Sequence, residues 1–447
     1  MRQGFKNSGS TDRANPRVTR RQFLATGSAG LGALAIGPLS SSRVLGANEQ
    51  INLAVVGSGM RGPQLIDQIH RLPEDANVSI AAVCEIYDRR KELIKDKAGV
   101  DKCHHDYREI LADPDIDALV IAVPDHWHLQ MSLDAMRAGK DIFLEKPMTL
   151  HWHEAKKVRD VQKETGRVVQ VGAGSASDDI WWQAKQLIGD GVTGLIGKVI
   201  HFQTSYNRNI PGGDWNYEIF DDADQKTVDW ELWQRPAAHH FPWQEQGAER
   251  FFRFRKYWDY SGGVASDLLY HKLAHMALAL DFPFPRRVVA NGGNYVHFDR
   301  EVPDTMTILA DFENDCSCTL FATGGNRDNL VEAIRGEHAT MTFERGQLVV
   351  TPQRPFVDAV QEKAKQYEDL EIQERERGGR KTLESITRKT QPRAGHMLNF
   401  VQCMRSRELP HLHAEAGYRV MTTIGLAVEA FRENKVVLFD PEKEEVV

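Results

Sequence analysis

The lysine of Glu145-Lys146-Pro147 is the residue whose type and surroundings point most directly to a reaction. It follows a short apolar run, Asp141 to Leu144, which predicts a buried strand. At the carboxyl end of a parallel strand, an ammonium can hold a substrate hydroxyl and help move its proton while a cofactor takes a hydride. The alternative is an ordinary surface lysine, which the tripeptide alone favours.

A glycine fingerprint, Gly57-x-Gly59-x-x-Gly62, stands upstream between an apolar run and a predicted helix. The first glycine permits a tight turn, the second lets the backbone approach a pyrophosphate, and the third lets the helix pack on the strand. Met60 and Arg61 lie at the helix N-terminus, where positive potential favours phosphate. This turn predicts a dinucleotide site.

Glu85, at the end of the second predicted strand, indicates which dinucleotide binds. Its carboxylate can accept the adenosine ribose hydroxyls, which favours NAD. Arg89 and Arg90 follow and can meet the 2′-phosphate of NADP instead. The alternative for both arginines is a solvated first helical turn. We predict NAD and leave NADP open.

The loop after the predicted strand Ala118 to Val123 contributes further cofactor contacts. Loops at the carboxyl ends of parallel strands line the ligand crevice, so Pro124 and His128 are predicted beside the nicotinamide, together with Glu145. The alternative is that the histidines of this loop cap or pack the next helix, and for His126 we favour packing.

Asp267 and His271 follow a Gly-Gly pair and predict an acid–histidine pair on one helix face. A carboxylate there can orient the imidazole and favour its charged form, and the imidazole can take a hydroxyl proton. The alternative is a helix-start aspartate and a core histidine. His271 and His275 are also four residues apart, but Lys272 stands where a zinc helix has glutamate, so we predict no metal.

Aromatic residues crowd the stretch from 207 to 260. Flat apolar faces beside polar groups suit pyranose rings, and Trp258 and Tyr260 are the two residues that we predict to face a substrate. For the other aromatic residues of the stretch we favour packing.

Two kinds of element must position these residues. From residue 48 to 171, apolar strands alternate with helices, which predicts a doubly wound parallel sheet of the Rossmann type. From 172 to 447, several strands follow one another with few helices, which predicts an α+β domain with an antiparallel sheet. The charged stretch from Gln361 to Arg393 is predicted to be a mobile excursion.

Composition excludes some classes of protein. The 447 residues carry a net charge of -7 without a basic stripe, so nucleic acid is not expected as a partner. Beyond the leader, no apolar run reaches the length of a membrane span. The five cysteines lack metal-type spacing and are predicted to be free thiols.

Residues 1–47 predict a twin-arginine signal peptide. Arg20-Arg21 is followed by Gln-Phe-Leu and an apolar stretch from Ala25 to Leu39. The alternative is a tail with a chance Arg-Arg pair. Such a signal directs export of a folded protein, so we expect a periplasmic or otherwise exported protein whose cofactor is bound before export.

These motifs together resemble the Gfo/Idh/MocA oxidoreductase family, named for glucose–fructose oxidoreductase and inositol dehydrogenase. The resemblance runs from about Asn52 to the C-terminus. It implies that Lys146 contacts substrate and nicotinamide, that Asp267 orients substrate, and that His271 is the acid or base. It also implies a large open antiparallel sheet whose face forms a homo-oligomer, and sugar or cyclitol substrates.

We therefore expect an NAD(P)-dependent oxidoreductase that transfers a hydride between a carbohydrate hydroxyl and a tightly bound cofactor. One alternative is a redox-neutral glycosidase that works by oxidation, elimination, hydration and reduction with bound NAD. A second alternative is a non-catalytic sugar-binding protein that keeps the fold.

Overall fold

Six parallel strands form the first sheet, in the order β3-β2-β1-β4-β5-β6. The computed structural model describes residues 49–190, 194–344, 346–377 and 380–447, so the predicted signal peptide lies outside the described residues. The strands are β1 (Ile51–Val56), β2 (Val78–Cys84), β3 (Cys103–His104), β4 (Ala118–Ile121), β5 (Asp141–Leu144) and β6 (Val169–Val171). The surrounding helices are α2 (Arg61–His70), α3 (Asp88–Ala98), α4 (Tyr107–Leu111), α5 (His128–Arg137), α6 (Trp152–Thr165) and, from the end of the chain, α12 (His396–Ser406).

The central strand β1 directs its side chains alternately to the two faces of this sheet. Ile51, Leu53 and Val55 pack on one face with α2, α3 and α12. Ala54 and Val56 pack on the other face with α5 and α6. Because all five side chains are buried, both faces of the sheet are covered, as in a doubly wound fold. The predicted Rossmann-type sheet is confirmed.

Strand register brings three predicted motifs to one edge of the sheet. Val56 at the end of β1 pairs with Ile121 at the end of β4, which pairs with Leu144 at the end of β5. The glycine turn, the Pro124 loop and Lys146 follow these three strand ends. Since ligands of open α/β sheets bind outside the carboxyl ends of the strands, this edge is the expected cofactor position.

Eleven strands form the second sheet, in the order β14-β15-β13-β12-β11-β7-β10-β9-β8-β16-β17. β7 and β10 pair in parallel, and the other neighbouring strands are antiparallel. The strands are β7 (Val199–Ser205), β8 (Pro285–Gly293), β9 (Thr305–Phe312), β10 (Ser317–Thr323), β11 (Ala333–Gly336), β12 (Ala339–Glu344), β13 (Gln347–Pro352), β14 (Glu371–Arg377), β15 (Arg380–Lys389), β16 (Val437–Asp440) and β17 (Glu445–Val446). The predicted α+β domain with a large sheet is confirmed.

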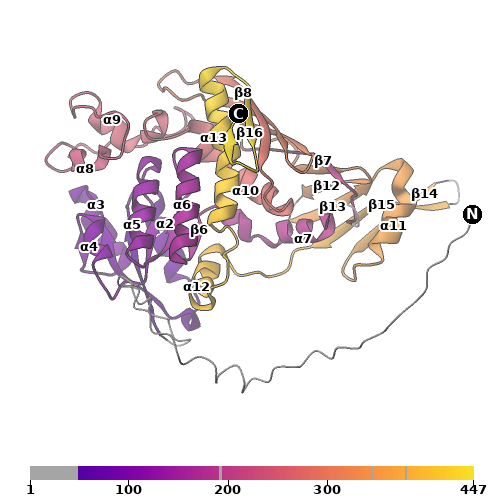
Figure 1. Cartoon of the computed structure of the whole chain (residues 1–447), viewed down its shortest axis with the longest axis horizontal. Coiled ribbons are helices and arrows are strands. Elements are labelled where there is room, and N and C mark those ends of the chain that lie inside the picture. Colours follow the sequence, from indigo (N-terminus) through magenta and orange to yellow (C-terminus); the bar gives the residue numbers. More distant parts are fainter. Residues whose placement is uncertain (1–48, 191–193, 345, 378–379) are drawn as a thin grey trace, which may run out of the picture. The chain divides into compact units, whose positions relative to one another are not determined.

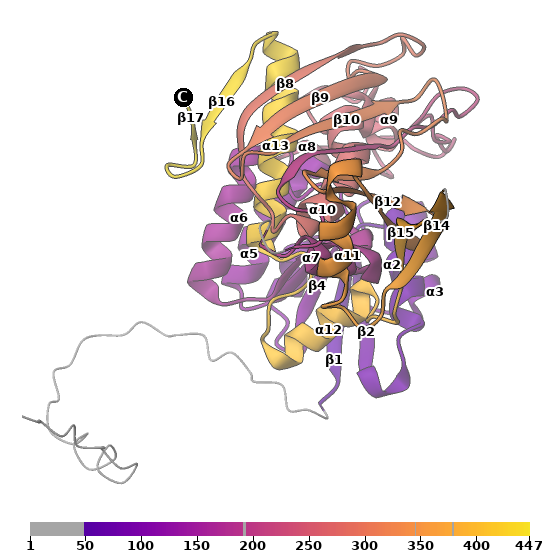
Figure 2. The same cartoon turned by 90° about the vertical axis from the view of Figure 1, so that its right-hand side faces the viewer.

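The helices that pack against this second sheet include α7 (Asp179–Ile188), α10 (Tyr270–Ala279) and α13 (Ala414–Glu433). Figure 2 shows α13 lying beside β8 and β16. α10 contacts β7, α7 and α13. It directly follows the segment that carries Asp267, so the same packing positions the predicted catalytic residues.

The stretch from 361 to 393, predicted to be a mobile excursion, has regular secondary structure over most of its described residues. The described residues there continue α11 (Val357–Ala364) and form the hairpin β14–β15, which extends one end of the second sheet (Figure 1). Leu383 and Ile386 are buried. Two apolar positions in a charged run are enough to pack one face of an edge hairpin.

Residues 207–260, which we call the aromatic segment, leave the second domain and reach back to the first. They contain the short helices α8 (Trp230–Gln234) and α9 (Gly247–Phe252). Val228 forms an antiparallel bridge with Tyr87, and Asp88 N donates to Thr227 O at 3.0 Å. An aromatic cluster joins Tyr87 of the first domain to buried residues of the aromatic segment.

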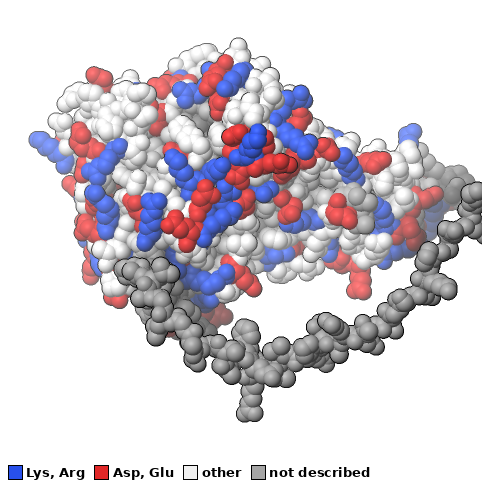
Figure 3. All heavy atoms as spheres, in the orientation of Figure 1, with Lys and Arg blue, Asp and Glu red and all other residues white. Residues whose placement is uncertain are grey.

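Acidic and basic side chains are intermixed on the face shown in Figure 3, with no continuous basic stripe there. Among the described residues, no helix is long and apolar enough to cross a membrane.

Candidate active site

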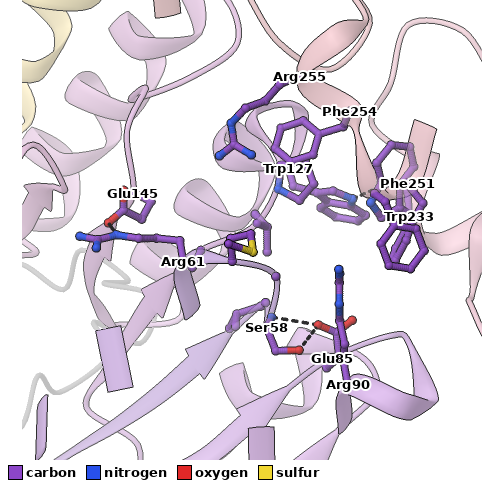
Figure 4. A pocket seen from close by; sticks show the side chains of 18 of the residues that line it. Ser58, Arg61, Glu85, Arg90, Trp127, Glu145, Trp233, Phe251, Phe254 and Arg255 are labelled. Atoms are coloured by element: carbon purple, nitrogen blue, oxygen red, sulfur yellow. Dashed lines mark hydrogen bonds and ion pairs between the residues drawn. The ribbon is translucent and has the colours of Figure 1, made fainter. Parts of the chain in front are cut away.

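A cavity of about 670 Å³ lies where the strand ends of the first sheet face the aromatic segment. Its wall includes the glycine turn as well as Lys146, Asp267 and His271. Figure 4 shows the turn and Glu85 on one side and the rings of Trp127, Phe251 and Phe254 on the other. The motifs predicted separately for cofactor and for chemistry therefore share a single space.

The glycine turn fits a dinucleotide by three different geometries. Gly57 has φ +90°, and a Cβ there would lie 2.5 Å from Ala122 O. A Cβ on Gly62 would lie 2.1 Å from Gly57 O. A Cβ on Gly59 would meet nothing within 4 Å, so this position opens into the cavity and leaves room for a pyrophosphate.

Glu85 lies on the cavity wall with its carboxylate held by the local backbone. Its Oε2 accepts from Ser58 N at 2.9 Å and from Ser58 Oγ (Figure 4). Its Oε1 accepts from Ile86 N at 2.7 Å and Tyr87 N at 3.0 Å. A ribose hydroxyl must therefore share this carboxylate with, or displace, the Ser58 hydroxyl.

The two arginines after Glu85 lie in different surroundings. Arg89 places its guanidinium 4.2 Å from the centre of the Phe220 ring and pairs with Asp222 at 3.2 Å. It is not among the described residues that line the cavity, contrary to the predicted cofactor contact. Arg90 lines the cavity and stacks 4.8 Å from the Phe252 ring centre, so it is the arginine that faces the adenosine end.

Met60, Arg61, Pro124 and Glu145 all line the cavity, as predicted. Arg61 Nε donates to Glu145 Oε1 at 2.6 Å, and this pair joins the start of α2 to the loop after β5 (Figure 4). The ion pair fixes the backbone on both sides of the predicted pyrophosphate position.

His128 does not line the cavity, so its predicted place beside the nicotinamide is wrong. Its side chain is 1% exposed, and its ring nitrogens contact Pro147 O at 2.7 Å and Val123 O at 2.9 Å. The imidazole ties the end of β4 to the turn that follows Lys146, which is a structural role.

Lys146 and Asp267 form the centre of the site. Lys146 Nζ donates to Asp267 Oδ1 at 2.7 Å and to Asp267 O at 2.8 Å. Arg255 Nε also donates to Oδ1 at 2.8 Å, and Trp215 Nε1 donates to Oδ2 at 3.0 Å. Burial by itself raises the pKa of Asp267, but the charges of Lys146 and Arg255 hold it well below its usual range. The carboxylate orients the ammonium.

His271 lies one turn later without a bond to Asp267. The residues from Ala265 to Leu269 form a π-helical turn before α10, which changes the expected facing of the two side chains. No side chain in the described part of the chain is hydrogen-bonded to the imidazole. Burial and the charge of Lys146 lower the pKa of His271 to about 2, so the ring is neutral, opposite to the predicted charged form.

Trp258 and Tyr260 are not part of the cavity wall, and their predicted substrate contacts are wrong. Tyr260 is fully buried, with its ring 4.6 Å from that of Trp233. Trp258 packs 6.3 Å from Phe431 of α13. Both rings consolidate the aromatic segment and its neighbours.

Ten residues of the aromatic segment line the cavity without having been predicted, and among them are the polar side chains of Arg208, Tyr217, Glu218 and Arg255. Trp215, from the same segment, donates a hydrogen bond from Nε1 to Asp267 Oδ2. Nothing in the spacing of these residues predicts their position, because a long irregular loop brings them to the cavity. Around these groups, no cluster of three or more His, Cys, Asp or Glu residues suited to a metal exists among the described residues.

The histidine predicted to pack, His126, does so and holds the aromatic segment. It is 5% exposed; Nε2 donates to Trp233 O at 2.9 Å, and Nδ1 is buried without a partner among the described residues. Burial lowers the pKa of His126 to about 3, from an ordinary value of 6.5.

The free energy of unfolding is therefore expected to fall as the pH drops below about 6.5. The unfolded chain binds a proton that the folded chain excludes, which costs up to about 1.4 kcal/mol per pH unit until the folded pKa is reached. The free energy of unfolding is measured by urea denaturation at pH 7.5 and 5.0. Its decrease between these pH values should be smaller in His126→Gln than in the parent protein, by the contribution of about one proton. The same change at the exposed His240 is the control. Equal slopes for both variants would contradict this.

The comparisons with known proteins agree with this fold. Residues 51–173 match the family described as "Oxidoreductase family, NAD-binding Rossmann fold", and residues 237–439 match its "C-terminal alpha/beta domain". Scyllo-inositol 2-dehydrogenase (NAD(+)) of Bacillus subtilis is 33% identical over 154 residues, 34% of this chain and 44% of that enzyme. Inositol 2-dehydrogenase/D-chiro-inositol 3-dehydrogenase of Lactiplantibacillus plantarum is 32% identical over 163 residues, which are 36% of this chain and 45% of that enzyme.

The chain thus spans less than half the length of these two curated relatives. Among solved structures, levoglucosan dehydrogenase in complex with NADH and L-sorbose superposes with a TM-score of 0.61 at 17% identity, over 87% of this chain and 99% of that one. An NAD-binding protein from Listeria innocua superposes with a TM-score of 0.61 at 20% identity, over 87% of this chain and 99% of that one. At these identities the likeness shows the fold. With its NAD-binding Rossmann domain and C-terminal α/β domain, the chain belongs to the Gfo/Idh/MocA oxidoreductase family.

Proposed function

We propose that this protein is an NAD(P)-dependent oxidoreductase that transfers a hydride between a carbohydrate or cyclitol hydroxyl and a tightly bound nicotinamide cofactor. The observation that carries the proposal is that Lys146, Asp267 and His271 line the same cavity as the Gly57–Gly62 turn. The matched relatives support the substrate class, since they are named as inositol dehydrogenases.

Each group has a distinct task in this proposal. The N-terminus of α2 and the open Gly59 position receive the pyrophosphate, and Glu85 receives the adenosine ribose. A nicotinamide bound there supplies the hydride acceptor or donor. Lys146 uses two of its three N–H bonds on Asp267, so the third can hold a substrate hydroxyl. The neutral His271 ring can accept the hydroxyl proton.

The cover over part of the cavity supports the proposed tight retention of the cofactor. Trp233 and Phe251 come from the aromatic segment, and its contacts with the first domain include Trp127 Nε1 donating to Trp233 O at 2.7 Å. A dinucleotide beneath these rings would be partly covered by the segment, which would slow its release. We propose that it is loaded before export by the twin-arginine route.

Denaturation of the purified, dialysed protein tests the proposal. We expect it to release close to one dinucleotide per chain, identified by mass as NAD, because Glu85 and not Arg89 faces the ribose end. Release of NADP would assign the selection to Arg90. A protein that holds no dinucleotide and binds none when it is added would contradict the proposed function.

The redox-neutral glycosidase is the second candidate, and the covered cofactor cavity favours it, because a trapped cofactor must be restored in place. A panel of sugars and glycosides separates the two. Keto-sugar with reduced cofactor supports the oxidoreductase, and free aglycone without added NAD supports the glycosidase. Neither product, despite a bound dinucleotide, would leave a sugar-binding protein.

A further inference from the structure

Arg255 presents an unused hydrogen-bonding edge to the cavity. Its Nε is committed to Asp267, and its guanidinium lies 4.5 Å from the Phe254 ring centre, which fixes its plane. Neither Nη atom has a hydrogen-bond partner among the described residues. The side chain is 21% exposed and lines the cavity, and in Figure 4 it projects inward above the glycine turn. A guanidinium edge in this state is a fork for two acceptor oxygens.

Three cationic side chains gather around this edge, with the carboxyl groups of Asp267, Asp125 and Asp214 beside them. Lys146, Arg255 and Arg208 all line the cavity near Asp267, and the charges of all three lower the pKa of that carboxyl. The oxygens of Asp267 are already occupied by donors. Arg208 donates to Tyr206 Oη at 3.1 Å, and its nearest carboxylate, Asp214, is 3.9 Å away.

We infer that the substrate carries an anionic oxygen group, which the free edge of Arg255 binds while Lys146 holds the reacting hydroxyl. This inference rests on the proposed function and narrows it from carbohydrates in general to acidic ones. Arginine forks match the planar carboxylate and also bind phosphate. A carboxylate is the closer geometric match, because the available edge is flat and already held in plane by Phe254 and Asp267.

Calorimetric titration of the dinucleotide-loaded protein with D-glucuronate and D-glucuronamide tests the inference without turnover. The two ligands differ only in the charged group, so the wild-type protein alone can give the answer. We expect the acid to bind at least about tenfold more tightly, as a charge-assisted bidentate contact predicts. D-Glucose 6-phosphate is the third ligand; if it binds more tightly than the acid, the anionic group is a phosphate ester.

Arg255→Lys keeps the charge and removes the fork, and we expect it to abolish most of this preference. Arg253→Lys is the matched control, since Arg253 is occupied by Tyr217 O and Glu249 and does not line the cavity. Three results would overturn the inference. The acid and the amide bind equally well, or none of the three ligands binds, or the preference for the acid persists in Arg255→Lys. Failure of the proposed function is separate, because it shows as a protein without dinucleotide.

Discussion

Replacement of Lys146 by Met is expected to lower the turnover rate by about two to four orders of magnitude, the usual range for loss of a positioned proton-transfer group. The ammonium is the only cation that contacts both the carboxylate and the backbone carbonyl of Asp267 among the described residues. Arg255 and Trp215 still satisfy that carboxylate in the variant, so the site should keep its shape. The loss should appear in kcat rather than in the amount of bound dinucleotide.

The absorbance change of the bound nicotinamide, followed in single turnover, measures this effect. Lys140→Met is the matched control, because Lys140 precedes the same strand and donates to Asp113 O and Ile116 O at the opposite end. We expect that variant to lose stability and keep its chemistry. If Lys146→Met turns over as the parent protein does, the lysine has no role in proton transfer.

Alanine substitutions in the glycine turn are expected to separate folding from cofactor binding. At Gly62 a methyl group would meet a backbone oxygen at 2.1 Å, so Gly62→Ala should destabilise the fold by about 1–3 kcal/mol. At Gly59 the methyl group meets no protein atom within 4 Å. Without dinucleotide, Gly59→Ala should therefore have the same unfolding temperature as the parent protein. Its affinity for dinucleotide should be at least about tenfold lower.

Thermal unfolding and the dinucleotide released per chain measure the two effects on the same samples. Gly395→Ala places a methyl group in open space away from the cavity and should change neither. Full dinucleotide content in Gly59→Ala would mean that the pyrophosphate does not pass this position, and the assignment of the cofactor path would be lost.

The parts of the fold that follow from local patterns were predictable. The alternation of strand and helix, the glycine turn and the lysine after β5 each depend on neighbours in sequence, and register alone then brings them to one sheet edge. Spacing marked Asp267 and His271 as an acid–histidine pair, the family resemblance gave them their roles, and both line the cavity. Their relation to one another was not predictable, because the π-helical turn at Ala265–Leu269 interrupts the assumed helical spacing.

The errors share a different physical cause. Trp258, Tyr260 and His128 lie close in sequence to residues of the site, but the direction of a side chain in irregular structure is set by distant partners. Tyr260 is held by Trp233, and His128 by Pro147 O. For the same reason Arg255 was not predicted as a site residue, because its contact with Asp267 depends on how the whole aromatic segment crosses the first domain.

That crossing imposes an order on assembly. The residues of the first sheet leave the ribosome before the aromatic segment does, and domains made first tend to fold first. Until Val228 pairs with Tyr87, the edge that receives the dinucleotide stands open to solvent. The nascent chain thus exposes this edge to ligands more widely than the finished protein does, in which the aromatic segment forms part of the cavity wall.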